Sequence, residues 1–343
     1  MRWRYQMTVG LLCLSLLCSG CFGAQEVDDV SFVLTIGVDE SNEPGLYVFT
    51  FRIAMPRAFT GDGGGEDNKK KTKLVSVKAP TITNAVRQLA VAMNRQPEMS
   101  HVSAFFVHES IAKQGVYDFV SLFMRSKIYR NTMVVLVTRE PVKEVMEKNT
   151  SPFELFQYRW VDSLKRTQKF ASGYLINNVR EFYVDLSAPQ AAALATYGSV
   201  QNDSLEKKAL PSLEHQAVPQ LTAENFPRAG GTELIAVGSA VFQDWKMTKM
   251  LTSDEAFGAN ILTKGVQTMY AVPDPEQAGE WANIGLETRK PEIDVRMERG
   301  KMIADVKIKA IFELIDASSN VDYTRGEKRK VLEERVATAI RCV

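Results

Sequence analysis

The residues best placed to carry chemistry are three cysteines near the start of the chain. Cys13, Cys18 and Cys21 lie within nine residues, and two small residues, Ser19 and Gly20, come directly before Cys21. Small side chains let a signal peptidase approach the backbone, and the Cys21 thiol can form a thioether with diacylglycerol. The spacing therefore predicts a lipoprotein-processing site with lipidation at Cys21. The alternative is an ordinary signal peptide that is cleaved near Gly23-Ala24.

The segment that positions these cysteines has the parts of an export signal. Arg2 and Arg4 form a short positive region, and residues 7–18 form an apolar run of about 12 residues. A membrane-spanning helix needs roughly 20 apolar residues, so this run fits a secretory signal better than a membrane span. We predict a lipoprotein signal peptide over residues 1–20. The mature protein is then expected to be exported and anchored to the extracytoplasmic face of the membrane through Cys21.

The remaining chemistry-bearing residues form no recognisable catalytic or metal-binding pattern. His101, His108 and His215 have no metal-ligand spacing, and the sequence has no CxxC motif. After removal of the signal and lipidation of Cys21, Cys342 is left without a partner for a disulfide. The sequence contains no phosphate-binding loop, dinucleotide fingerprint or nucleophile elbow. The stretch His108-Glu109-Ser110 has acid and base residue types, but we expect a helix-capping or strand-end histidine there. The sequence therefore predicts a protein without catalytic residues, metal or cofactor.

Composition sets broad limits on the type of protein. The 343 residues include 42 Lys and Arg against 41 Asp and Glu, which gives a net charge of +1. A nucleic-acid-binding protein would be expected to show a basic excess, so nucleic acid is not an expected partner. The apolar fraction of 45% is typical of globular proteins. The length after signal removal suggests two or three domains.

Hydrophobic periodicity predicts a mixed α/β (α+β) architecture with packed helices. Apolar residues alternate over residues 30–38 and 47–53, which predicts an antiparallel hairpin with one buried face. A helical stripe follows Thr81, which is expected to cap it. The five apolar residues 133–137 predict a strand buried on both faces, as in a parallel or mixed sheet covered by helices.

The pattern changes along the chain and suggests a division into lobes. We predict an N-terminal mixed α/β lobe over residues 21–201, either undivided or as two subdomains. A polar, proline-containing linker is expected over 202–231, and a C-terminal α/β domain over 232–343. In that second lobe we expect a bulge or close backbone approach at Gly238, a helix capped by Ser253, one strand with a core face over 305–314, and a helical stripe at Leu332, Val336, Ala339 and Ile340.

Several segments, in this order and spacing, resemble the Ger(x)C lipoproteins. The first matches the mature start of that family, although Phe22 and Gly23 replace its usual Trp-Asp pair. The second matches a block with a histidine, a strand and a helix start, and the third matches a hairpin in the second lobe. The residues that carry the resemblance are Cys21, Glu26, Val27 and Gly37-Val38-Asp39; His101, Glu109, Ala112, Gly115, Arg125 and Arg130; and Gly238, Ala240, Val241, Phe242, Leu251, Thr252, Glu255 and Gly258.

The resemblance implies a function that the residues alone do not. Ger(x)C proteins are the C subunits of GerA-type nutrient germinant receptors in endospore-forming bacteria. They are multi-domain, non-catalytic lipoproteins that act with an A subunit and a polytopic B subunit, and in a spore former the expected location is the inner spore membrane. Chains of the family usually continue beyond a long helix into one more strand, so we expect either that the C-terminal domain is shortened here or that the protein continues beyond Val343.

Two other functions are consistent with an exported protein. A solute-binding lipoprotein of an importer would be expected to have two similar lobes around one cleft, and the unlike patterns of the two halves argue against it. An envelope hydrolase would need a nucleophile and base pair, which the sequence does not show. The favoured expectation is a non-enzymatic, lipid-anchored receptor subunit.

Overall fold

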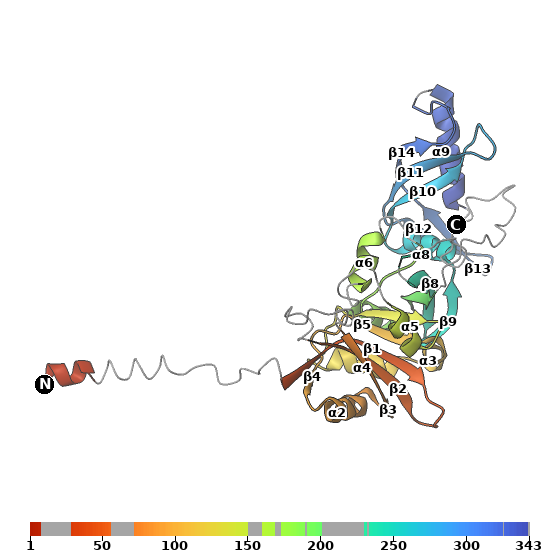
Figure 1. Cartoon of the computed structure of the whole chain (residues 1–343). Coiled ribbons are helices and arrows are strands. Elements are labelled where there is room, and N and C mark those ends of the chain that lie inside the picture. The colour runs from red at the N-terminus through yellow and green to blue at the C-terminus, as the bar shows by residue number, and fades with distance from the viewer. Residues whose placement is uncertain are drawn as a thin grey trace.

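The computed structural model describes residues 1–7, 29–55, 72–149, 160–168, 173–188, 191–200, 230–231, 233–324 and 326–341. The described strands form three sheets, and the two larger ones lie toward opposite ends of the molecule (Figure 1). The larger sheet and its helices come mainly from the first 251 residues, and the smaller sheet and its long helix come from the rest. The expected mixed α/β fold with packed helices is confirmed.

The larger sheet has nine strands in the order β3-β2-β1-β5-β6-β7-β8-β9, with β4 added beside β1. Strands β1, β5, β6 and β7 run parallel to one another, and the two flanks of the sheet are antiparallel hairpins. The bounds are β1 (Val30–Glu40), β2 (Tyr47–Ala54), β3 (Thr72–Ala79), β4 (Gln96–Glu98), β5 (Ala104–His108), β6 (Val134–Thr138), β7 (Ala192–Val200), β8 (Leu234–Gln243) and β9 (Lys246–Leu251).

Helices cover both faces of this sheet. One core contains Phe119 from α4 and Phe182 from α7, and the other contains Val145 from α5 and Trp160 from α6. The helices are α2 (Ile82–Met93), α3 (Glu109–Gln114), α4 (Tyr117–Arg125), α5 (Val142–Lys148), α6 (Trp160–Thr167) and α7 (Val179–Ser187). Strand β6 is buried along its whole length, which confirms the prediction for residues 133–137. The Thr81 cap is also confirmed, because its Oγ1 accepts a hydrogen bond from the Asn84 amide at 3.2 Å.

The expectation of one buried face for the first hairpin is wrong. Strand β1 pairs with β2 as predicted, but β1 is central in the sheet and is buried on both faces. Ser31 and Thr35, which a simple alternation would turn toward solvent, are both buried, and the β1–β2 pairing shifts register between Val33 and Thr35. The missing side chain of Gly37 lets α5 lie close against this strand.

The smaller sheet has the strand order β10-β11-β14, and α9 packs on one of its faces. Its elements are β10 (Gln267–Pro273), β11 (Trp281–Thr288), β14 (Ala310–Ala317) and α9 (Gly326–Arg341). The predicted stripe Leu332, Val336, Ala339 and Ile340 is buried in this core, as expected. Among the described residues, β14 is hydrogen-bonded to a neighbouring strand along only one of its edges.

A two-stranded arm extends from this sheet. It consists of β12 (Glu292–Glu298) and β13 (Lys301–Lys307), which, among the strands that the structure describes, pair with each other alone. One face of the arm is apolar and exposed, with Ile293, Val295 and Met297 opposite Val306, Ala304 and Met302. The single strand expected over residues 305–314 is therefore two strands, and Val306 lies on the exposed arm instead of in the core.

Helix α8 (Ser253–Thr263) connects the two sheets and contributes to both cores. Its residues Phe257 and Ile261 belong to the core of the smaller sheet, while Ala256 packs beside Leu251 of β9. Its cap is Thr252 and not Ser253 as expected, because Thr252 and Glu255 form a capping box.

The strand β8 contains the expected close approach. Gly238 has φ +158°, and a Cβ there would lie 2.1 Å from the Leu251 carbonyl oxygen. The β7–β8 pairing also shifts register beside it, which fits a bulge. Strands β8 and β9 begin the segment expected to form the C-terminal domain, yet they complete the larger sheet. The domain limits themselves stay a prediction.

The described residues contain no helix with both the length and the apolar character that crossing a membrane would require.

Candidate functional site

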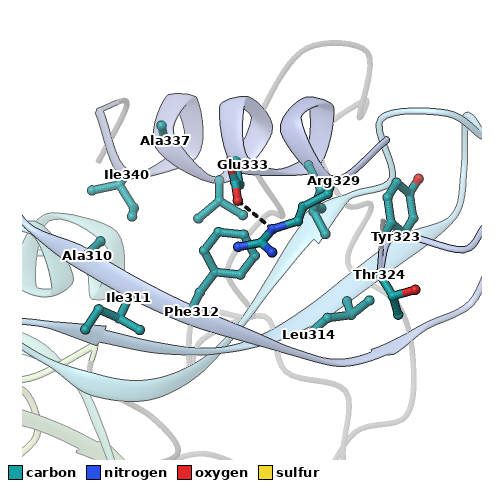
Figure 2. A pocket seen from close by; sticks show the side chains of 12 residues that line it. Ala310, Ile311, Phe312, Leu314, Tyr323, Thr324, Arg329, Glu333, Ala337 and Ile340 are labelled. Carbon is teal, nitrogen blue, oxygen red and sulfur yellow. Dashed lines mark hydrogen bonds and ion pairs between the residues drawn. The ribbon is translucent and has the colours of Figure 1, made fainter. Parts of the chain in front are cut away.

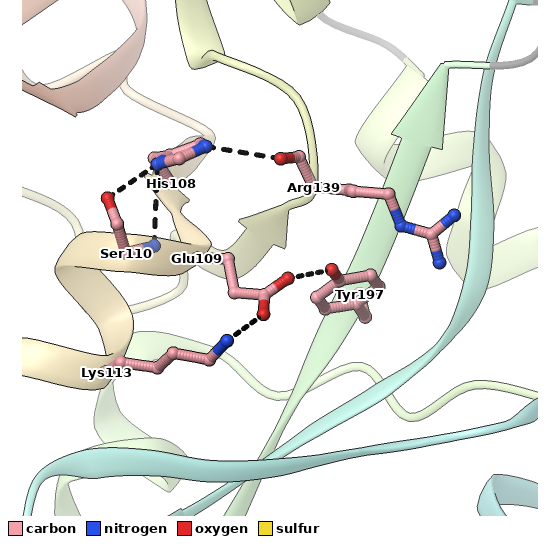
Figure 3. A network of polar contacts seen from close by, with 6 residues as sticks. All are labelled: His108, Glu109, Ser110, Lys113, Arg139 and Tyr197. Carbon is pink, nitrogen blue, oxygen red and sulfur yellow. Dashed lines mark hydrogen bonds and ion pairs between the residues drawn. The ribbon is translucent and has the colours of Figure 1, made fainter.

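A network of polar side chains lies at the carboxyl ends of the parallel strands (Figure 3). His108 ends β5, and its Nδ1 is 2.7 Å from the Ser110 hydroxyl and 3.4 Å from the Ser110 amide nitrogen. Its Nε2 lies 3.2 Å from the Arg139 carbonyl oxygen. Since Nδ1 accepts from Ser110, Nε2 carries the proton and donates to Arg139. His108 is thus the N-cap of α3, which confirms the expected helix-capping histidine.

Glu109 forms the second part of the network. Its carboxylate accepts hydrogen bonds from the Tyr197 hydroxyl and the Lys113 ammonium, and the Arg139 guanidinium carbon lies 5.8 Å from the centre of the Tyr197 ring. Partial burial acts to raise the pKa of Glu109, but the hydrogen bonds from Lys113 and Tyr197 outweigh it and lower that pKa. Burial, together with the Glu109 carboxylate, raises the pKa of Tyr197. Glu109 is therefore held ionised between a phenol and a cation.

The chemistry of this network is that of a structural junction. Ser110 and His108 are two positions apart in the sequence. Their contact arises from helix capping, because the same Nδ1 also accepts a hydrogen bond from the Ser110 amide. The Glu109 carboxylate joins α3 to β7 through Tyr197. These contacts fix the ends of β5, β6 and β7 relative to one another.

The Gly37-Val38-Asp39 stretch at the end of β1 has a clear structural role. Asp39 accepts hydrogen bonds from the amides of Val142 at 2.6 Å and Lys143 at 3.1 Å, at the start of α5. Burial raises the pKa of Asp39, although these two hydrogen bonds act to lower it. A Cβ at Gly37 would lie 2.2 Å from Val142 Cγ1. Gly37 thus lets α5 approach the strand, and Asp39 caps the helix.

The other end of α5 is held by a buried arginine. Arg52 from β2 donates to the Met146 carbonyl oxygen and, at 3.1 Å, to Thr72 Oγ1. Burial lowers the pKa of Arg52 to about 10. A carboxylate at the start and a guanidinium at the end both complement the helix dipole. Charged side chains from β1 and β2 therefore fix α5 on the sheet at both of its ends.

The described residues show no group of three or more His, Cys, Asp or Glu side chains that could hold a metal ion. His101 lies apart from the His108 network in its contacts. Its Nδ1 is 3.2 Å from the Ser100 hydroxyl, and its ring packs edge-on against Phe32 with the centroids 5.1 Å apart. His215 lies outside the described residues, as do Cys342 and the predicted lipidation site Cys21.

A groove of about 580 Å³ lies between β14 and α9 (Figure 2). Its floor is formed by Phe312 and Leu314 of β14, and its roof by apolar residues of α9 such as Val336. Arg329 and Glu333 lie over Phe312 and form an ion pair at 2.9 Å. The groove is mainly apolar, with one charged pair on its helical side.

Sequence reasoning missed this groove. Its signals were present, because residues 310–314 alternate and α9 has an apolar stripe. Both patterns predict burial, however, and neither shows that the helix leaves part of the strand uncovered. That depends on where α9 crosses the sheet, which no local pattern encodes.

Comparison with protein families matches nearly the whole described chain in two parts. Residues 23–199 match a family model described as the spore germination protein N-terminal domain. Residues 237–342 match a model described as spore germination B3/GerAC like, C-terminal.

Two curated proteins and one solved structure also align with the chain. The chain is 24% identical over 317 residues to spore germination protein KC of Bacillus subtilis (strain 168), which covers 91% of this chain and 74% of that protein. It is 21% identical over 349 residues to putative spore germination protein YfkR of the same organism, covering 98% and 81%. The crystal structure of the GerBC protein aligns with a TM-score of 0.42 and 12% identity, over 89% of this chain and 79% of that one.

Proposed function

The chain belongs to the GerAC-like family of spore germination proteins, and from this membership we propose that it is a lipid-anchored, non-enzymatic subunit of a membrane receptor complex that responds to nutrients. Its role would be to hold and position partner subunits, an A-type subunit and a polytopic B-type subunit, so that nutrient sensing leads to germination. The proposed location is the extracytoplasmic face of the inner spore membrane, with Cys21 as the anchor.

The observation that carries the proposal is the pair of family matches. The N-terminal and the C-terminal models match in the family's order and together include residues 23–199 and 237–342. A match to one model alone would fit a shared domain in an unrelated protein. Both together favour a chain that does what full family members do.

The arrangement of the polar residues supports a non-enzymatic role. His108, Glu109 and Asp39 are engaged in capping and in joining elements, so the strongest acid and base candidates are explained by the fold. The importer alternative is less well supported. Its two lobes would resemble each other, whereas here a nine-stranded sheet accompanies a three-stranded one.

The experiment that tests the proposal is deletion of the gene in the spore-forming host. We expect spores that form normally but respond poorly to one class of nutrient, while decoated spores treated with lysozyme recover full viability. Expression of the full chain should restore the nutrient response. Normal germination by the deletion strain on every nutrient tested would contradict the proposal.

Partner binding needs a second measurement. The tagged full chain, extracted from spore membranes in mild detergent, should co-purify with the polytopic subunit encoded in the same host. Co-purification with an ATPase and a permease in place of the polytopic subunit would favour the importer function.

A further inference from the structure

One end of the larger sheet carries basic side chains. Strands β1, β5 and β6 are parallel, so the segments that lead into them all lie at their amino ends. The segment between α4 and β6, residues 125–132, contains Arg125, Lys127 and Arg130 and has no aspartate or glutamate. All three of these side chains are exposed. We call residues 125–132 the basic turn.

Packing fixes the basic turn on the sheet. Tyr129 is 6% exposed, and its ring meets the ring of Phe123 edge-on with the centroids 4.9 Å apart. The Arg130 carbonyl oxygen accepts a hydrogen bond from the Met133 amide at 3.3 Å, just before β6 begins. The neighbouring Ile128 is by contrast 52% exposed. The turn therefore presents an aliphatic side chain to solvent between two basic positions.

The end of α2 adds a second group of the same kind. Helix α2 contains no acidic residue, and its exposed residues Arg87 and Val91 lie one turn apart, with Val91 83% exposed. Arg95 follows the helix, and β4 then pairs with the start of β1. Glu98 of β4 accepts a hydrogen bond from the Ser100 amide at 2.8 Å, so its carboxylate is engaged within its own turn. The end of α2 thus lies at the same margin of the sheet as the start of β1.

These cations differ from those near the carboxyl ends of the strands. There, Lys78 forms an ion pair with Glu43 at 2.6 Å. At the amino ends the basic side chains outnumber the acidic residues Asp29 and Glu98, and within the described chain none of them is in an ion pair. We call this set the basic edge, and it consists of Arg87, Arg95, Arg125, Lys127 and Arg130. Its unpaired charge favours an anionic partner.

The residue proposed to carry the anchor is connected to the same end of the sheet. Strand β1 begins at Val30, and eight residues separate Val30 from Cys21. A chain of that length spans at most about 30 Å. A diacylglycerol on Cys21 would hold the amino end of β1 within this distance of the bilayer. The tether is shorter than β1 itself, whose 11 residues rise about 36 Å, and so it favours approach of the amino end over the carboxyl end.

We propose that the basic edge lies against the membrane surface and binds the phosphate groups of anionic phospholipids, with Ile128 and Val91 entering the interface. This inference rests on the proposed function through the anchor at Cys21. The attraction between basic side chains and an anionic leaflet weakens with salt. The basic edge orients a chain that is already anchored and does not replace the anchor, because stable attachment takes more than one signal.

Two double variants with the same change in net charge separate the basic edge from the charge of the whole molecule. Lys127→Glu combined with Arg130→Glu reverses two exposed charges of the basic turn. The matched control is Lys301→Glu combined with Lys307→Glu, which reverses two exposed charges of β13 in the other lobe. Ile128→Ser removes the exposed aliphatic side chain and leaves every charge in place.

The measurement is flotation of the chain from residue 21 onward with Cys21→Ala, so that it carries no lipid, with vesicles at low salt. We expect binding to vesicles of phosphatidylcholine mixed with phosphatidylglycerol, no binding to phosphatidylcholine alone, and release as the salt is raised. The variant with Lys127→Glu and Arg130→Glu should bind about tenfold more weakly or less, since each basic side chain near an anionic surface contributes about fivefold. Ile128→Ser should have a smaller effect, and the β13 control should bind like the parent.

Three outcomes would overturn the proposal. The first is equal binding to both kinds of vesicle, and the second is binding to neither, which is expected if the basic edge contacts a protein subunit instead. The third is equal binding by the charge-reversed variant and its control. Lys127→Gln combined with Arg130→Gln removes the same charges without adding acidic groups, and it decides the matter if the charge-reversed variant fails to fold.

Failure of the anchor would be seen separately. Acyl labelling of the wild-type chain tests Cys21, whereas the vesicle experiment uses a chain that has no lipid. A wild-type chain without label would refute the anchor and leave the vesicle result standing. A labelled chain whose basic edge ignores anionic vesicles would keep the anchor and refute the present inference.

Discussion

At the scale of single residues, Gly37 and Asp39 explain why a helix can lie directly on the central strand. The missing side chain of Gly37 leaves room for Val142, and the Asp39 carboxylate binds the amides of Val142 and Lys143. These two residues form part of the stretch by which the sequence resembles its family. Their contacts give this stretch a role in the packing of α5 on the sheet.

Replacement of Gly37 tests this close approach. Gly37→Ala should lower the free energy of unfolding by roughly 1–3 kcal/mol, because the new methyl group would overlap Val142 Cγ1 and force α5 outward. Urea unfolding followed by far-ultraviolet circular dichroism measures the change. Gly285→Ala in β11 is the control, since a Cβ there meets its nearest atom at 3.7 Å. Equal effects of the two substitutions would rule out a special role for Gly37.

Cys21 supports a prediction about the membrane anchor. Cys21→Ala should abolish fatty-acid labelling and release the chain from the membrane fraction, because stable anchoring requires about two acyl chains and the diacylglycerol would supply both. Loss of anchoring should also weaken germination, since the anchor raises the local concentration beside membrane partners. Cys18→Ala, within the predicted signal, is the control and should keep its label. Unchanged labelling of Cys21→Ala would refute the anchor.

At the scale of elements, Asp274 connects the end of β10 to the segment that leads into α9. Its carboxylate accepts hydrogen bonds from Ser319 at 2.6 Å, from Tyr323 at 2.5 Å, and from the amides of Glu276 and Gln277. Burial acts to raise the pKa of Asp274, but these four hydrogen bonds outweigh it and hold that pKa below its usual value of 3.8. The ionised form therefore stabilises the fold.

The pH dependence of stability follows from the sign of that shift. The folded pKa is lower than the unfolded one, so the contribution is complete above pH 3.8 and is lost as the pH falls through the folded pKa. Asp274→Asn should cost about 1.5–3 kcal/mol at neutral pH, and its deficit relative to the parent should shrink below about pH 4. Urea unfolding at several pH values tests this, with Asp294→Asn on the exposed arm as control. A deficit that stays constant with pH would contradict the assignment.

The sequence correctly predicted those helices and strands whose burial follows one simple pattern along their whole length. Strand β6 is buried throughout, and the stripes of α2 and α9 each face a single core. The second buried face of β1 was missed because Ser31 and Thr35 are polar residues and yet are buried. The separation of β13 from β14 was missed because the alternation continues across Ile308 while its covering helix does not.

The candidate site was predictable only in part. His108 was expected to be a cap and is one, because capping depends on local sequence. Its contact with Arg139, and the contact between Glu109 and Tyr197, join residues that are 31 and 88 positions apart. The groove likewise depends on how α9 lies across β14. Such long-range contacts follow from the whole fold and not from any one segment.

At the scale of the whole molecule, the larger sheet needs the two strands that follow the predicted linker. Strand β8 pairs with β7 along nine residues, and Phe242 packs edge-on against Phe182 with their ring centroids 4.9 Å apart. β9 then completes that flank of the sheet. The N-terminal unit that can fold is thus expected to extend to residue 251.

Two fragments test this extent. A fragment of residues 21–251 should unfold cooperatively in urea, because it keeps every strand of the larger sheet. A fragment of residues 21–231 should aggregate or unfold without cooperativity, because the β7 edge and Phe182 lose their partners. Circular dichroism and sedimentation compare the two. Equal stability would place the limit of the folding unit at residue 231.

Helix α8 makes contacts with both parts of the molecule. Phe257 stacks on Tyr270 of the smaller sheet, while Asn260 donates to the Tyr174 carbonyl oxygen and Ser253 to that of Val237. The buried positions of the helix, Ser253, Ala256, Phe257, Asn260 and Ile261, are therefore constrained by one part of the molecule or the other. The two lobes should consequently diverge together in evolution, and a chimera that joins lobes from distant relatives should fail unless α8 and the surfaces on both of its sides come from one parent.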